Sequence, residues 1–190
     1  MINNAENLYN LHPISVADYQ RMAEAGILDI DTRVELIEGE IIDMVPIGSP
    51  HAAIVNRLTR ELVRQAENSA LVSVQNPIIL GDYSEPEPDL VLLKPKANDY
   101  QDALPQAEDI LLLIEVADST LNYDRKIKAP LYARFGIFEF WLINLPQQSV
   151  TLFQKPLQDQ FSIATTLMAP KILTPLLLPH INLDLGQLFK

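Results

Sequence analysis

The sequence contains no cysteine and few glycines, and its longest aliphatic run, residues 110–114, is only five residues long. Without cysteine the protein can form no disulfide and no thiolate metal site, and it has no cysteine nucleophile, a composition that suits a reducing cytoplasm. A membrane-spanning helix needs roughly 20 apolar residues, so none is expected. The N-terminal stretch MINNAENLYNLHP lacks a basic segment followed by an apolar one, so we expect no secretory signal and a cytoplasmic protein.

Positive charge is also scarce. The chain has 14 Lys and Arg against 25 Asp and Glu, a net charge of −11. This balance argues against a protein that binds nucleic acid through a broad basic surface. A local patch remains possible, because Arg57, Arg60 and Arg64 fall near one face of a predicted helix. The apolar share of 48% is ample for a dense core, and it favours a homodimer or higher homo-oligomer.

Hydrophobic periodicity and turn residues predict the order of the elements. Pro130 is tolerated only in a first helical turn, so we expect the regular part of the last long helix to begin near Ile127. The predicted elements are a helix capped by Ser15 and ending before Gly26, a hairpin (33–37 and 40–44) turning at Glu38-Gly39, a helix over 51–68, strands over 71–80, 88–93 and 109–117, a helix within 124–134, a strand over 138–144, a hairpin (150–154 and 161–167), and a tail (176–188) that packs back.

The predicted order from residue 51 is helix, strand, strand, strand, helix, strand, or αβββαβ. An antiparallel three-strand meander followed by a helical crossover gives a mixed sheet flanked by helices, so we expect an α+β fold with α/β-like layers. The 190 residues make one domain. Within it we expect an N-terminal helix and hairpin (1–48), a core (51–144), and a C-terminal hairpin and tail (148–190).

Two carboxylates mark the predicted central strands. Asp89 begins one strand and Glu115 lies near the end of the next. If these strands pair antiparallel, both side chains meet at one rim of the sheet, where adjacent strands are about 4.8 Å apart. The repulsion between them would be relieved by Mg²⁺ or Mn²⁺, hard cations that prefer oxygen ligands. The spacing therefore predicts a metal site suited to phosphodiester hydrolysis.

A cation from the protein should complete such a site. Lys128 opens the following helix on its apolar side and could reach over the rim; Lys126 is the alternative on another side. Glu35 and His51 are further candidates for the site. Ordinary structural roles compete with each assignment. Asp89 could cap the start of its strand, Glu115 could mark where a strand reaches water, Lys128 could be solvated, Glu35 could be a hairpin charge, and His51 could mark a helix entry.

Seven segments of the chain form an ordered set of motifs, 34–41 (VELIEGEI), 49–51 (SPH), 84–90 (SEPEPDL), 114–120 (IEVADST), 123–128 (YDRKIK), 138–143 (FEFWLI) and 178–185 (LPHINLDL). Taken in order, these motifs resemble the Uma family within the PD-(D/E)XK restriction-endonuclease-like superfamily, over nearly the full length. The resemblance implies a restriction-endonuclease-like fold and a DNA endonuclease that uses Mg²⁺ or Mn²⁺.

The resemblance also implies roles for individual residues. Asp89 and Glu115 would be metal ligands, with the carbonyl of Val116 as a third. The superfamily usually places its lysine two residues after the glutamate, where this chain has Ala117. Uma-like sequences move that lysine to the following helix, which makes it Lys128, and they add Glu35 and His51 as accessory residues. The competing hypothesis is a catalytically inactive module that serves binding or assembly, which Ala117 and the acidity favour.

Overall fold

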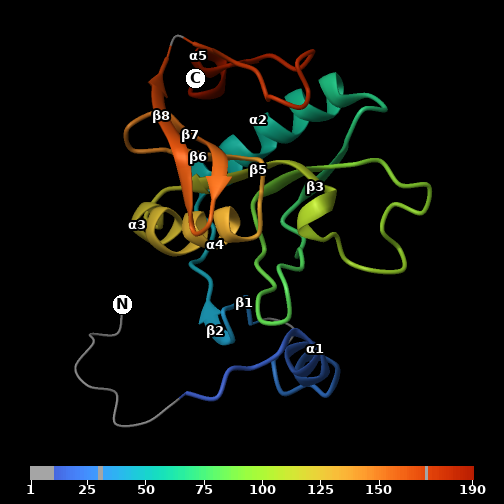
Figure 1. The fold of residues 1–190 in the computed structure, drawn as a ribbon. Coiled ribbons are helices and arrows are strands. Elements are labelled where there is room, and N and C mark those ends of the chain that lie inside the picture. The colour runs from blue at the N-terminus through green and yellow to red at the C-terminus, as the bar shows by residue number, and fades with distance from the viewer. Residues whose placement is uncertain (1–10, 30–31, 170) are drawn as a thin grey trace.

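The computed structural model describes residues 11–29, 32–169 and 171–190. A six-stranded mixed sheet forms its centre (Figure 1). Its first three strands make an antiparallel meander, the third and fourth run parallel, and the last three are antiparallel, which confirms the predicted α+β mixed sheet. In spatial order the strands are β3 (Leu71–Val74), β4 (Leu90–Leu93), β5 (Ile110–Ala117), β6 (Glu139–Asn144), β7 (Ser149–Leu157) and β8 (Gln160–Met168).

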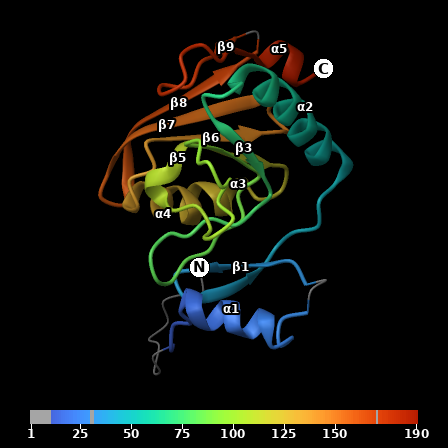
Figure 2. The same ribbon diagram turned by 90° about the vertical axis from the view of Figure 1, so that its right-hand side faces the viewer.

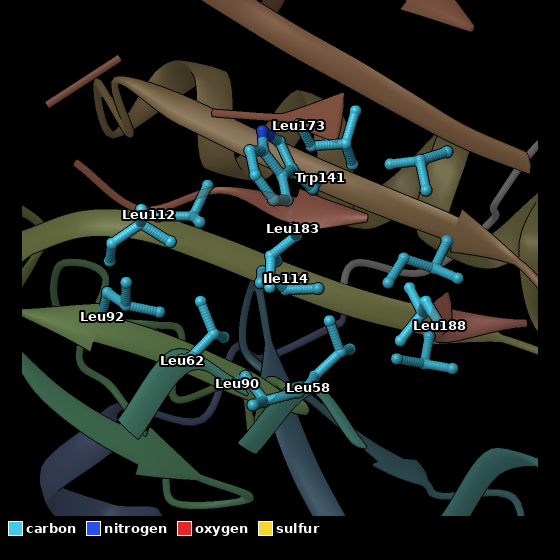
Figure 3. Packing of buried hydrophobic residues seen from close by; sticks show 14 of the residues in the cluster. Leu58, Leu62, Leu90, Leu92, Leu112, Ile114, Trp141, Leu173, Leu183 and Leu188 are labelled. Carbon is cyan, nitrogen blue, oxygen red and sulfur yellow. The ribbon is translucent and has the colours of Figure 1, made fainter. Parts of the chain in front are cut away.

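Helices cover both faces of this sheet, as Figure 2 shows. Helix α2 (Ser49–Ala66) lies on one face with the C-terminal segment, and α4 (Ala129–Arg134) lies on the other. The central strands alternate accordingly, with Ile114 facing α2 and Leu113 facing α4. Around Trp141, leucines of α2 meet those of the C-terminal segment, so the predicted tail does pack back (Figure 3). That segment contains β9 (Ile172–Leu173), β10 (Leu183–Asp184) and α5 (Leu185–Leu188).

The N-terminal elements form a separate layer beside the strand ends. Helix α1 (Val16–Glu24) begins where the Ser15 side chain accepts a hydrogen bond from the Asp18 N–H, as predicted. Strands β1 (Val34–Ile37) and β2 (Glu40–Asp43) form the predicted hairpin. Leu36 of β1 exchanges two backbone hydrogen bonds with Glu85, N–O distances 3.3 and 2.7 Å. These bonds hold the hairpin against the segment that leads into β4.

The hairpin turn depends on Gly39, which has φ +83° after Glu38 at φ +50°. A Cβ at Gly39 would lie 2.5 Å from the Pro13 Cβ, whereas one at Gly136, φ +74°, would meet nothing within 4 Å. Gly39→Ala should therefore combine backbone strain with a clash and lower the free energy of unfolding by about 3 kcal/mol, against about 1 kcal/mol for Gly136→Ala. Urea denaturation measures both, and equal losses would show that the contact with Pro13 costs nothing.

Several predicted boundaries are wrong. The strand expected over 71–80 ends at Val74, because the chain turns at Gln75, φ +49°, and Pro77 has no N–H for a ladder. Beyond the turn, Ile79 makes only an isolated bridge to Gln106. The long helix over 51–68 also begins earlier than predicted, at Ser49, with Pro50 in its first turn.

The helix expected within 124–134 begins earlier, with α3 (Leu121–Tyr123), whereas its regular α-helical part, expected from near Ile127, begins at Ala129. It continues through a π-helical segment, η2 (Asp124–Lys128), directly into α4. The widened turn accommodates Pro130, which cannot donate to the carbonyl four residues back and would clash with it in a regular helix. A short 3₁₀ turn, η1 (Ala107–Asp109), precedes β5. Within the described residues no helix could span a membrane, and the expectation for residues 1–10 lies outside that part of the chain.

Candidate active site

The pairing of β4 with β5 brings Asp89 and Glu115 together. The two strands are antiparallel, with Leu90 opposite Ile114, so the residues just beyond that pair are neighbours. The Asp89 backbone N–H donates to Glu115 Oε2 at 3.3 Å. Glu115 lies two residues after Leu113 and Asp89 two residues before Val91, and both of these apolar residues face α4. The two carboxylic residues therefore lie on the same face of the sheet. The predicted convergence of the two carboxylates is confirmed.

The Asp89 carboxylate is held by three donors. Its Oδ2 accepts from the backbone N–H of Val116 at 2.9 Å and lies 3.0 Å from His51 Nε2, and its Oδ1 accepts from Gln75 Nε2 at 3.2 Å. The hydrogen bond to Asp89 raises the pKa of His51, and burial opposes that effect. His51 therefore holds Asp89 from the first turn of α2, while Nδ1 of its ring is buried with no partner among the described residues.

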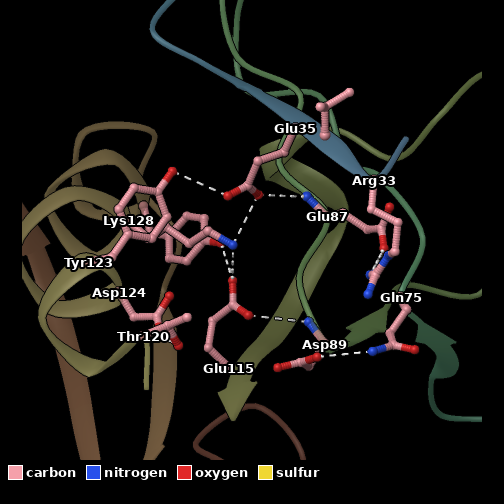
Figure 4. Close-up of polar contacts among 12 residues, drawn as sticks. Arg33, Glu35, Gln75, Glu87, Asp89, Glu115, Thr120, Tyr123, Asp124 and Lys128 are labelled. Atoms are coloured by element: carbon pink, nitrogen blue, oxygen red, sulfur yellow. Dashed lines mark hydrogen bonds and ion pairs between the residues drawn. The ribbon is translucent and has the colours of Figure 1, made fainter. Parts of the chain in front are cut away.

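Glu115 is fixed from the opposite side by the helix. Its Oε1 accepts from Lys128 Nζ at 3.0 Å and from the Tyr132 hydroxyl at 2.7 Å. Lys128 Nζ also lies 3.0 Å from Glu35 Oε2, which brings the hairpin into the site (Figure 4). The side chains of Lys128, Glu35 and Glu115 are each no more than 5% exposed. Lys128 thus forms a buried bridge between two carboxylates from different parts of the fold.

The π-helical segment shapes this side of the site. Tyr123 and Lys128 are five residues apart, yet both contact Glu35, since the Tyr123 hydroxyl donates to Glu35 Oε1 at 3.2 Å. The widened turn, whose Ala129 N–H donates to the Asp124 carbonyl, suits this spacing better than a regular helical turn. Short π-helical insertions of this kind occur often at functional sites.

Negative charge exceeds positive charge around Lys128. Burial raises the pKa of Glu115, and the charge of Lys128 opposes that rise. Burial alone would lower the pKa of Lys128, but Glu115, Glu35 and Asp124 outweigh it and raise that pKa, so the ammonium group stays charged. Burial also raises the pKa of Asp124, whose carboxylate accepts from the Thr120 hydroxyl at 2.7 Å.

A cavity of about 360 Å³ opens over these groups. The hairpin, the start of α2, the ends of β4 and β5, and the π-helical segment all contribute to its walls. Every residue that the sequence singled out for the site lines this one cavity, namely Glu35, His51, Asp89, Glu115, Val116 and Lys128. Lys126, the alternative to Lys128, is exposed and is absent from the lining.

Comparison with known families identifies the chain. The model of a family named Uma2, described as "Putative restriction endonuclease", matches residues 16–186. The chain belongs to the Uma2 family. A crystal structure titled as "a putative nuclease belonging to DUF820 from Anabaena variabilis ATCC 29413" is similar to this Uma2 chain at TM-score 0.75 and 18% identity, covering 93% of this chain and 98% of the other. At that identity the likeness shows a shared nuclease-like fold. No curated protein matches.

The donor set of this Uma2 chain fits a hard divalent cation, although no group of three or more His, Cys, Asp or Glu side chains with metal-site geometry occurs in the described part. Asp89 and Glu115 supply two carboxylates, and Lys128 and Tyr132 occupy only one oxygen of Glu115. The Val116 N–H points toward Asp89, so its carbonyl faces the same edge of β5. Carboxylate and carbonyl oxygens are the ligands that Mg²⁺ and Mn²⁺ prefer.

Several contacts of the Uma2 site were missing from the sequence-based prediction. The sequence predicts Gln75 inside a strand, and nothing in the pattern of residues there indicates a contact with Asp89. Tyr132 lies four residues after Lys128, so helical spacing could have revealed it. Conversely, the predicted basic patch on α2 is weak. Arg57 donates to the Leu188 carbonyl, whereas Arg60 and Arg64 are exposed and share Glu61.

Proposed function

We propose that this Uma2 protein is an endonuclease that hydrolyses DNA phosphodiester bonds with the help of Mg²⁺ or Mn²⁺. The observation that supports the proposal is the convergence of Asp89, Glu115 and Lys128 in one cavity, two carboxylates and one enclosed ammonium group drawn from three elements. Family membership and the nuclease-like fold support the same reaction class.

Each group has a distinct task in this proposal. Asp89, Glu115 and the Val116 carbonyl would hold the cation, which when bound supplies charge neutralisation and an acidified water for phosphodiester hydrolysis. Lys128 stays protonated beside Glu115 and would hold the attacking water or a phosphate oxygen in place. Glu35 holds Lys128 from the hairpin, and His51 holds Asp89 from α2.

Relaxation of supercoiled plasmid tests the proposal. The wild-type protein should nick DNA with Mg²⁺ or Mn²⁺ and stop when EDTA is added. Glu115→Gln keeps the shape of the side chain and removes its charge, so nicking should fall by at least about a hundredfold. Glu108→Gln, at an exposed glutamate outside the cavity, should cut like the wild type. Nicking that survives in Glu115→Gln would indicate a contaminating nuclease and contradict the proposal.

The alternative is a catalytically inactive module that keeps the fold for binding or assembly. Ala117 replaces the usual lysine, and Lys128 is already engaged by two carboxylates. On this alternative, pure protein would show no metal-dependent nicking of plasmid, single-stranded DNA or RNA. Such a result, obtained with protein that is folded and stabilised by metal, would favour the inactive module over the nuclease.

A further inference from the structure

The charges that line the cavity raise the question of how it receives an anionic substrate. Three basic side chains line the cavity, Arg33, His51 and Lys128. The acidic residues in the lining outnumber them, and they are Glu35, Asp43, Glu87, Asp89, Glu115, Asp118 and Asp124. A phosphodiester entering this cavity needs a cationic group that it can reach.

Lys128 and His51 are poorly placed to meet an arriving phosphate. The Lys128 side chain is 5% exposed and its charge is shared between two carboxylates. The His51 ring is 14% exposed and faces Asp89. Arg33 differs from both, because its side chain is 37% exposed and pairs with one carboxylate, Glu87 Oε1, at 2.7 Å.

The chemistry of the guanidinium group allows it to hold two anions. It carries five N–H donors in a planar fork, and in Arg33 one nitrogen, Nη2, donates to Glu87 Oε1. The remaining donors can bind a phosphate while that ion pair persists. Arg33 precedes β1, and Figure 4 shows it with Glu87 on the opposite side of the Asp89 segment from Lys128. A phosphate bound to Arg33 would lie in the same cavity as the carboxylates of Asp89 and Glu115, to one side of them.

We infer that Arg33 is the phosphate-binding residue of the cavity, contacting the DNA backbone beside the bond that is cut. This inference rests on the proposed function and deepens it. In a chain of net charge −11, Arg33 gives the acidic cavity one partly exposed guanidinium that an arriving phosphate can reach.

A purely structural role predicts a different pattern. Glu87 belongs to the segment that leads into Asp89, and its backbone N–H donates to Glu35 Oε2 at 3.3 Å. If Arg33 only anchored this segment, Glu87→Gln would break the same ion pair and reproduce the defect of Arg33→Met. If Arg33 binds phosphate, Glu87→Gln removes a competing anion and leaves the guanidinium in place. The two roles therefore predict opposite effects of Glu87→Gln on DNA binding.

The experiment measures binding of a short fluorescent DNA duplex by anisotropy, with Ca²⁺ in place of Mg²⁺, across a range of salt concentrations, and nicking kinetics with Mg²⁺. Arg33→Met should weaken binding about tenfold and lower the slope of log K against log salt by about 0.9. It should raise KM more than it lowers kcat. Glu87→Gln should bind as tightly as the wild type or more tightly. Arg134→Met is the matched control, since Arg134 is 45% exposed, pairs with Glu38 and lies outside the cavity lining.

The outcomes separate the two proposals. If the wild type binds and nicks DNA and Arg33→Met binds with the same affinity and salt slope, the inference is overturned and the proposed function stands. A Glu87→Gln variant that is as defective as Arg33→Met also overturns it, in favour of a structural role. If the wild type neither binds nor nicks DNA, the proposed function fails and the inference fails with it. Equal losses in Arg33→Met and Arg134→Met would indicate a general charge effect and contradict the assignment.

Discussion

Replacing Lys128 with methionine should lower the free energy of unfolding by about 3–5 kcal/mol, because Glu35 and Glu115 would then be buried without their counter-charge. Methionine has a similar length and fills the space, so packing contributes little to the loss. Urea denaturation monitored by circular dichroism measures it. Lys126→Met, at the exposed alternative position, should stay within about 0.5 kcal/mol of the wild type.

A double variant separates the stability of this cluster from its chemistry. Glu35→Gln combined with Lys128→Met removes one of the two stranded charges and should recover part of the lost stability. Nicking should be absent in both Lys128→Met and the double variant, because neither has an ammonium group beside Glu115. If Lys128→Met alone were as stable as the wild type, the ion pairs would contribute nothing to folding. If the double variant cut DNA, Lys128 would have no part in the reaction.

Asp89→Asn should abolish the stabilisation of the protein by divalent metal. For the wild type, a cation at about 100 times its Kd adds about 2.7 kcal/mol, which raises the Tm of a chain of this size by about 5–10 °C. Asparagine keeps the size of Asp89 and can still accept from the Val116 N–H, but it removes one of the two carboxylates proposed to hold the metal. Differential scanning fluorimetry over a titration of MgCl₂ or MnCl₂ measures the shift.

Asp118→Asn is the control for this experiment. Asp118 also lines the cavity, but it is exposed and is not one of the proposed ligands. Asp118→Asn changes the charge of the cavity by the same amount as Asp89→Asn but leaves both proposed ligands in place. It should therefore keep most of the metal-linked rise in Tm. A rise that persists in Asp89→Asn, or that disappears equally in both variants, would show that the metal binds through diffuse charge and not at the paired carboxylates.

The part of the site that the sequence predicts lies at strand ends. Asp89 and Glu115 flank long aliphatic runs, and antiparallel pairing of adjacent strands is a local rule, so their convergence follows from spacing alone. Helical spacing also places Lys128 on the apolar side of its helix, and the same spacing could have revealed Tyr132. In each case the regular repeat of a strand or a helix determines where the side chain lies.

The rest depends on irregular backbone or on distant segments. Gln75 reaches Asp89 because β3 stops at a positive φ angle, and Tyr123 reaches Glu35 through a π turn that periodicity does not encode. Pro130 indicates that the helix is irregular near this point, but it does not indicate a π turn. The ion pair of Arg33 with Glu87 joins residues 54 positions apart across two structural layers. Only tertiary packing determines such contacts.

The exchange of backbone hydrogen bonds between Leu36 and Glu85 bears on how small a fragment could still form this cavity. The αβββαβ core carries Asp89, Glu115 and Lys128, so by itself it contains both carboxylates and the ammonium group of the site. However, the Lys128 ammonium group is paired with Glu35, and the β1–β2 hairpin, which precedes that core in the sequence, forms one wall of the cavity. A fragment without the hairpin would lack Glu35 and one wall of the cavity. The smallest fragment that keeps the whole cavity therefore contains both the hairpin and the core.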